Sequence, residues 1–194
     1  MPSAPDCFRE AGMFVRQQTS AFMQCFTPDQ CSEWLRERGI IESPYLTDEA
    51  NDSFCLQFEP PQKSSRLTAF TRSLFDGFGE FPGALVVFTD WALYRPDEMA
   101  LVDSMRRGYG EQRSLIDAPG NLFGPTEQAE AIACCYLAVI FQWSAYLYLA
   151  SGAATVLFWE GDLIDVWSSH EKLPQAIQEI VQTYELRVTS GTDA

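Results

Sequence analysis

Three apolar runs near the C-terminus, joined by short glycine-containing connections, restrict the possible folds most. They cover Ala145 to Leu149, Thr155 to Trp159 and Leu163 to Trp167. Ser151-Gly152 and Glu160-Gly161-Asp162 connect them. Because tight turns between antiparallel strands need short loops with glycine, the pattern predicts consecutive β-hairpins.

Helical periodicity dominates the rest of the chain, around two further strand candidates. Ala84 to Phe88 is continuously apolar, which predicts a central strand buried on both faces, and Phe54 to Phe58 predicts a short strand. Residues 114–125 are a turn-rich connector. In the N-terminal third, a helix is predicted because Phe8, Ala11, Val15, Phe22 and Phe26 lie on one helical face. A second helix is predicted from Thr27 to Gly39, with a capping box formed by Thr27 and Gln30. Further amphipathic or capped segments predict helices from Ser64 or Ser65 to Phe78, from Arg95 to Gly108, from Thr126 to Gln142, and from Pro174 onward. We therefore expect one α+β domain over residues 1–194, with a mixed or antiparallel sheet whose C-terminal hairpins pack against several helices.

The stretch from Ala131 to Leu149 tests whether the protein is soluble. Only Gln142 and Ser144 in it are polar, and about 19 such residues are long enough to span a bilayer. However, Pro125-Thr126-Glu127 opens a helix, and the aromatic-rich end runs into a turn and another strand-like segment. A buried helix followed by a buried strand is the favoured interpretation, and no membrane association is expected.

Charge restricts the choice of partner. The chain has 27 acidic and 13 basic residues and a formal net charge of -14. After Arg113 there are ten acidic residues and two basic ones, and residues 42–60 contain five acids and no base. Because nucleic-acid affinity depends on Lys and Arg displacing counterions from phosphates, nucleic acid is a poor partner. A basic protein is the natural complement of this surface.

The cysteines and the N-terminus indicate a reducing compartment. None of the six cysteines forms a CxxC pair, and the adjacent Cys134 and Cys135 are poorly placed to bridge each other. The opening residues contain no basic segment followed by an apolar one, so no signal peptide is visible. We expect free thiols and a cytoplasmic protein.

No catalytic, metal or cofactor motif stands out. His170 is the only histidine, and no second histidine follows it at zinc-helix spacing. Gly77-Phe78-Gly79 lacks the third glycine of a dinucleotide fingerprint, and no phosphate-binding loop is present. Ser169 to Lys172 matches Ser-x-x-Lys, a pattern frequent by chance. The sequence thus predicts no catalytic residues, no metal site and no cofactor.

A candidate interaction surface lies in the last hairpin. Strand alternation places Leu163, Asp165 and Trp167 on one face, with Glu160 and Asp162 in the preceding turn. The simpler interpretation is a solvated face. The sharper one is a partner-binding surface in which Trp167 anchors and Glu160, Asp162 and Asp165 select a cationic partner.

A second candidate follows the central strand. Asp90, Trp91 and Tyr94 combine one acid with two aromatic side chains, a composition typical of a binding rim. Trp91 as an ordinary core residue is the alternative.

The segments ALVVFTDWALY, YGEQRSLIDAPGNLF and TVLFWEGDLIDVW, within residues 84–167, resemble those of uncharacterised bacterial proteins. The overall type resembles cytosolic immunity proteins that neutralise interbacterial toxins, such as type VI secretion effectors. The resemblance implies a small acidic protein that binds and blocks a basic, nuclease-like toxin effector. Two alternatives stay open: an adaptor or chaperone for another protein, and an enzyme that uses carboxylates or a cysteine.

Overall fold

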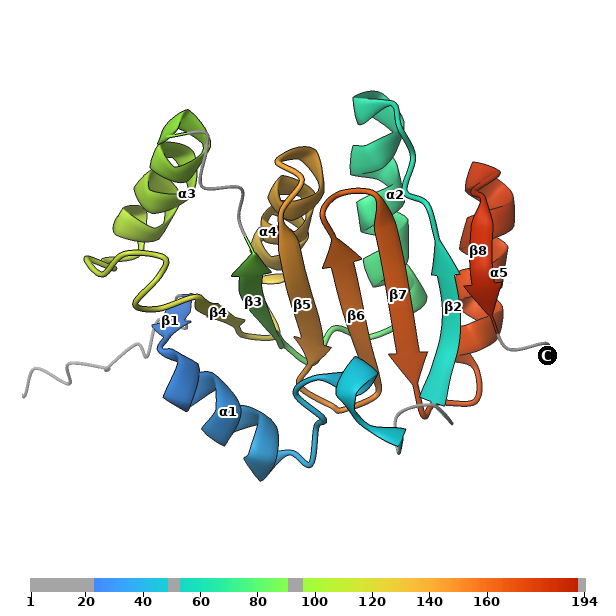
Figure 1. Cartoon of the computed structure of the whole chain (residues 1–194), viewed down its shortest axis with the longest axis horizontal. Helices are drawn as coiled ribbons and strands as arrows, with labels where there is room; N and C mark the ends of the chain where they lie inside the picture. The colour runs from blue at the N-terminus through green and yellow to red at the C-terminus, as the bar shows by residue number, and fades with distance from the viewer. Residues whose placement is uncertain (1–22, 49–52, 91–95, 192–194) are drawn as a thin grey trace, which may run out of the picture.

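The computed structural model describes residues 23–48, 53–90 and 96–191, which form one eight-stranded sheet with helices mainly on one face (Figure 1). In Figure 1, α2, α4 and α5 lie behind the sheet, and α1 lies at one end of it. The elements in chain order are β1 (Gln24–Phe26), α1 (Pro28–Glu37), η1 (Pro44–Leu46), β2 (Phe54–Phe58), α2 (Ser64–Gly77), β3 (Ala84–Asp90), α3 (Pro96–Gly108), β4 (Gly120–Phe123), α4 (Gln128–Ile140), β5 (Ser144–Leu149), β6 (Ala154–Trp159), β7 (Leu163–Ser168), α5 (Leu173–Tyr184) and β8 (Val188–Gly191).

Every neighbouring pair of strands in the sheet is antiparallel, and the strand order is β1-β4-β3-β5-β6-β7-β2-β8. The predicted hairpins are confirmed as the consecutive strands β5, β6 and β7. Their turns contain Gly152 and Gly161, both with positive φ, which glycine adopts without steric cost. The predicted α+β class, with hairpins packed against helices, is confirmed.

The larger core lies between the sheet and the helices. It contains Phe70 and Phe75 of α2, Cys134 and Ala138 of α4, and Ile177 of α5, together with the strand residues that point toward them. β3 lies between β4 and β5, and its residues from Ala84 to Val86 are fully buried, as predicted for a central strand. The continuous apolar runs of the sequence therefore correspond to the strands beneath the helices.

Helix α1 packs on the opposite face of the sheet. Its N-terminus carries the predicted capping box, in which the Thr27 hydroxyl accepts from the Gln30 amide and the Gln30 side chain accepts from the Thr27 amide. Cys31, Trp34 and Leu35 form a second, smaller cluster with residues of β3 and β5. The sheet is thus partly covered on this side too.

Three short strands differ from the predictions. β4 lies within the predicted connector, β1 includes Phe26, which was predicted to be helical, and β8 was not predicted. These strands have three or four residues each and take their pairing from neighbours distant in sequence, so local periodicity does not indicate them. The rest of the predicted N-terminal helix lies outside the described residues.

The apolar stretch from Ala131 to Leu149 divides into α4 and β5, as expected. Within the described part of the chain, no helix has the length and hydrophobicity that a membrane crossing requires. Five cysteines are described, and all are buried free thiols, in agreement with the prediction; they are Cys25, Cys31, Cys55, Cys134 and Cys135. Cys7 lies outside the described residues.

Candidate functional site

The candidate site lies on the sheet face opposite α2, α4 and α5. Strand register aligns Leu157 of β6, Asp165 of β7 and Gln57 of β2 in one row across this face. The neighbouring residues Val156, Val166 and Leu56 point to the helical side and are buried in the main core. Asp165 therefore lies on an inner strand of the sheet, on the face that α2, α4 and α5 leave free and that α1 covers only in part.

Aromatic side chains cover this position. Tyr45, from η1, lies with its ring edge-to-face against Trp159 and Trp167, at centroid distances of 5.7 and 5.0 Å. Phe54 also packs against Trp167, at a centroid distance of 5.8 Å. Tyr45 is 48% exposed and Trp159 is 44% exposed, so two large rings reach the surface of this face.

Asp165 lies beneath these rings and is 0% exposed. Its Oδ2 accepts a hydrogen bond from the Tyr45 hydroxyl, whereas its Oδ1 is buried and has no hydrogen-bond partner among the described residues. The Gln57 amide donates to the Tyr45 hydroxyl at 3.4 Å, and the Thr189 hydroxyl donates to the Gln57 carbonyl at 2.6 Å. One carboxylate oxygen is thus held in a short polar chain and the other is left unsatisfied.

Burial raises the pKa of Asp165 above its ordinary value, because the charged form loses hydration. The hydrogen bond from Tyr45 opposes that increase, and so does the nearby Gln57 amide, which in the structure donates to the Tyr45 hydroxyl. The pKa of Tyr45 is raised as well, first by burial and then by its bond to the Asp165 carboxyl. Tyr45 therefore acts as a hydrogen-bond donor to Asp165.

The prediction of a solvated face at Asp165 and Trp167 is wrong. The two residues share one face as predicted, but Asp165 is fully buried and Trp167 is 5% exposed. The reason is tertiary: η1, about 120 residues earlier in the chain, places Tyr45 over both side chains. The exposed aromatics here are Tyr45 and Trp159, not the predicted Trp167. The sequence could have indicated Trp159, because alternation along β6 places its side chain on the same face as that of Leu157.

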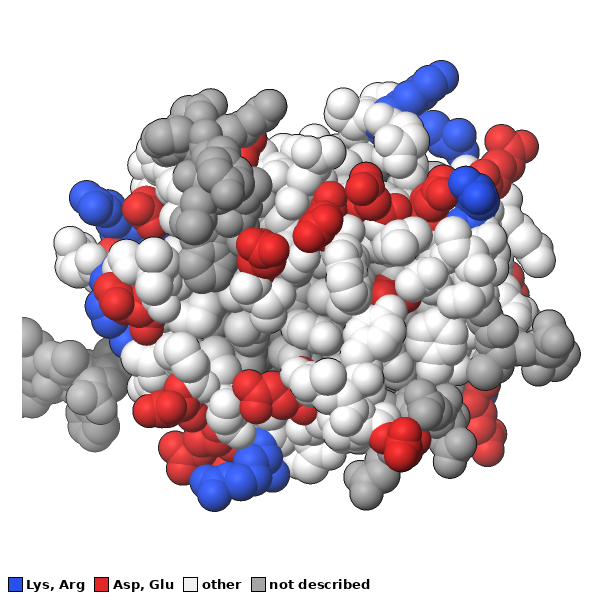
Figure 2. All heavy atoms as spheres, in the orientation of Figure 1, with Lys and Arg blue, Asp and Glu red and all other residues white. Residues whose placement is uncertain are grey.

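The predicted acids in the β6–β7 turn, Glu160 and Asp162, are exposed, and so is Asp90 at the end of β3. Strands β3, β6 and β2 all run toward this end of the sheet, which brings Asp90, Glu160, Asp162 and Glu59 to the same end. Figure 2 shows acidic side chains in a band across this end, above a largely uncharged face. We call this set the acidic end. Glu59 forms an ion pair with Arg187 at 3.0 Å. Trp91 and Tyr94 lie outside the described residues.

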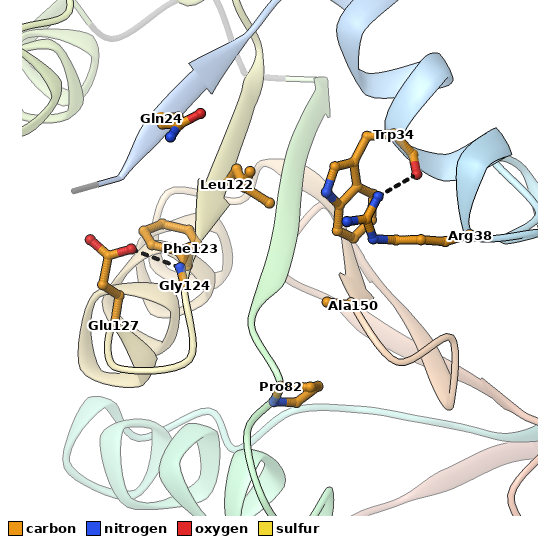
Figure 3. Close-up of a pocket in the computed structure, with 9 residues that line it drawn as sticks. All are labelled: Gln24, Trp34, Arg38, Pro82, Leu122, Phe123, Gly124, Glu127 and Ala150. Carbon is orange, nitrogen blue, oxygen red and sulfur yellow. Dashed lines mark hydrogen bonds between the residues drawn. The ribbon is translucent and has the colours of Figure 1, made fainter. Parts of the chain in front are cut away.

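A pocket of about 200 Å³ lies between α1 and the start of α4 (Figure 3). On one side of this pocket, the Arg38 guanidinium lies over the Trp34 ring at 4.2 Å and donates to the Trp34 backbone carbonyl at 3.2 Å. On the other side, the Glu127 carboxylate accepts from the Gly124 amide at 2.7 Å. Both charged groups are therefore engaged within the protein itself, and this pocket is the weaker candidate.

Another pocket, of about 420 Å³, is lined mainly by apolar residues of α2, α5 and the β5–β6 turn. His170 and Lys172 are also among its lining residues. His170 Nδ1 accepts from the Lys172 amide at 3.4 Å, which is a local turn contact. Among the described residues, no group of three or more His, Cys, Asp or Glu side chains is placed to hold a metal ion.

Comparisons with known proteins add no identity to this geometry. No protein-family model matches the chain, and neither the curated proteins nor the solved structures contain a match.

Proposed function

We propose that this protein is a non-catalytic binding domain that recognises a basic protein through the acidic end and the adjoining aromatic face. The observation that carries the proposal is that Trp159, a half-exposed ring, directly precedes the exposed acids Glu160 and Asp162, and that the half-exposed ring of Tyr45 packs against Trp159. Aromatic side chains at the centre of a patch with charged groups at its border are typical of protein interfaces.

The two parts of the surface have different physical roles. Exposed acids attract a cationic partner over several ångströms and mainly raise the association rate, an effect that salt screens. Rings that lose water on binding mainly slow dissociation. The net charge of -14 agrees with a partner of opposite charge and opposes binding to phosphate backbones.

Within this class, we propose an immunity protein of the cytoplasm that binds and inhibits a basic toxin effector. Two features support it: the overall type of the chain, small, acidic and without a catalytic motif, resembles that of immunity proteins, and the acidic end is suited to cover a cationic active site. A nuclease is the natural toxin of this kind, since its substrate cleft must attract phosphate.

The test begins by identifying a basic partner by affinity capture and then measures binding kinetics at two salt concentrations. The charge variant is Glu160→Gln/Asp162→Asn and the aromatic variant is Trp159→Ala. We expect the charge variant to associate more slowly and with a weaker salt dependence than wild type. We expect Trp159→Ala to dissociate about 30-fold faster, as for a hot spot of about 2 kcal/mol.

The matched control is Glu171→Gln/Glu179→Gln, which removes the same charge from exposed positions outside the acidic end. If this control slows association as much as Glu160→Gln/Asp162→Asn, the effect belongs to net charge and the proposed surface is wrong. If the partner has no toxic activity that this protein suppresses, the immunity proposal is rejected, whereas the binding surface is still supported.

A further inference from the structure

The buried carboxylate of Asp165 is the least explained group in the described structure. A carboxylate taken out of water is costly unless a cation or several hydrogen bonds replace its hydration. Asp165 receives one hydrogen bond, from Tyr45, and none of the ion pairs among the described residues includes it. Its Oδ1 lies buried and unpartnered. An apolar side chain, like that of its cross-strand neighbour Leu157, would suit this position better.

The groups around Asp165 suit a cation. The faces of aromatic rings attract Arg and Lys, most strongly where water is excluded. Tyr45 and Trp159 stand over this part of the sheet with half of their surface free, and the exposed acids Glu160 and Asp162 follow Trp159 directly. The sign of the charge, the aromatic rings and the unpartnered carboxylate oxygen thus all favour the same kind of ligand.

We propose that Asp165, Tyr45 and Trp159 form a recognition site for a single arginine side chain of the basic partner. The inference rests on the proposed function for the source of the arginine. The guanidinium bonds Asp165 Oδ1, and its stem lies against the two rings. Arginine suits the site better than lysine, because its planar fork can bond a carboxylate and stack on a ring at once.

Entry of the arginine requires Tyr45 to turn away from Asp165. Tyr45 is half exposed and is held by its hydrogen bond to Asp165, the 3.4 Å contact from Gln57 and ring edges. The guanidinium fork would then donate to both carboxylate oxygens, Oδ1 and the Oδ2 that the Tyr45 hydroxyl leaves, and the freed hydroxyl would bond to water. On the same side of the sheet, Arg38 already lies over the Trp34 ring at 4.2 Å, a local example of the contact proposed here.

The experiment uses N-acetyl-L-arginine amide as the probe and N-acetyl-L-citrulline amide as its neutral isostere. Binding is followed by NMR through the indole N–H signals of ¹⁵N-labelled protein, with those of Trp159 and Trp167 assigned by Trp→Phe variants. We expect a saturable shift of the Trp159 signal with the arginine probe, at millimolar concentration, and at least a 10-fold smaller response with the citrulline probe.

Two variants should move the affinity in opposite directions. Asp165→Asn removes the anion and should weaken binding of the arginine probe at least 10-fold. Tyr45→Phe keeps the ring but removes the competing hydroxyl, and should strengthen binding several-fold. Asp76→Asn, an exposed acid of α2 on the other side of the sheet, is the charge-matched control and should stay within about 2-fold of wild type. If Asp165→Asn does not fold, the Tyr45→Phe result decides alone.

The site is wrong if the citrulline probe binds as well as the arginine probe, if Asp165→Asn binds like wild type, or if Tyr45→Phe fails to strengthen binding. The proposed function fails separately. If the partner's association is slowed by Glu160→Gln/Asp162→Asn but Asp165→Asn alters neither its association nor its dissociation, the arginine site is rejected and the binding surface stands. If neither charge variant alters the partner's kinetics, the binding surface itself is rejected.

Discussion

The side chain of Asp165 conflicts with the strand that carries it. Its neighbours along β7, Ile164 and Val166, are fully buried and apolar, and Leu157 lies opposite it. Ionisation of Asp165 is therefore opposed by burial, and its pKa is raised. A raised pKa means that the folded state holds the proton more tightly than the unfolded state. Stability is then highest below the ordinary carboxyl pKa and falls as the pH rises through the raised one.

This sign gives a prediction for Asp165→Asn. The amide oxygen of the variant can still accept from Tyr45, but the side chain does not ionise. The stability of the variant should therefore lack the decrease that deprotonation of Asp165 causes in wild type as the pH rises. We expect its free energy of unfolding to exceed that of wild type by about 1 kcal/mol at pH 8, and by less at pH 4. Urea denaturation at several pH values measures this difference. Asp162→Asn is the control; an identical pH trend in both variants would show that burial of Asp165 is not the cause.

Helix α1 and η1 cover part of the sheet face opposite α2, α4 and α5. Helix α1 lies close to β4 at Gly120, where the absence of a side chain leaves room for Cys31. A Cβ at Gly120 would lie 2.3 Å from Cys31 Sγ and 3.0 Å from Phe26 Cβ. The absence of a side chain at this one position therefore allows the helix to reach the sheet.

Gly120→Ala should accordingly destabilise the protein by about 2 kcal/mol, because Cys31 and β1 must move to admit the methyl group. Gly108→Ala is the matched control. Gly108 is the last residue of α3, and a Cβ there would meet no atom within 4 Å. We expect that variant to be neutral or slightly more stable, because alanine favours helix over glycine. Thermal unfolding of both variants compares them; equal losses would contradict the close approach at Gly120.

At the scale of the whole molecule, antiparallel topology arranges the charge. Turns and strand ends from distant parts of the sequence meet at one end of the sheet, so Asp90, Glu59 and the acids of the β6–β7 turn lie at the same end. The apolar main core beneath the helices needs no cross-link. The described cysteines are buried free thiols, and burial raises the pKa of Cys31 to about 11 and that of Cys134 to about 12.

We therefore predict that excess thiol reductant leaves the melting temperature unchanged, since no disulfide among the described cysteines contributes to the core. Iodoacetamide at pH 8 should label Cys31 and Cys134 slowly in the folded protein, because little thiolate is present and access is blocked. Both should label quickly in denaturant, and mass spectrometry of peptides distinguishes the two states. A clear drop in melting temperature under reduction, or fast labelling of these two residues in the folded protein, would contradict the prediction.

Sequence alone determined the elements whose signals are local. The hairpins of β5, β6 and β7 follow from apolar runs and glycine turns, α1 from its capping box, and the acidic turn from Glu160 and Asp162. The strands β1, β4 and β8 could not be predicted, since three or four residues become a strand only when a distant partner supplies the hydrogen bonds. Exposure at the site was decided in the same way. Alternation placed Asp165 and Trp167 on one face, but only the folded chain brings Tyr45 over them, burying the predicted anchor and leaving Tyr45 and Trp159 at the surface. Which face of a strand is solvated depends on what packs against it, and that contact joins residues about 120 positions apart.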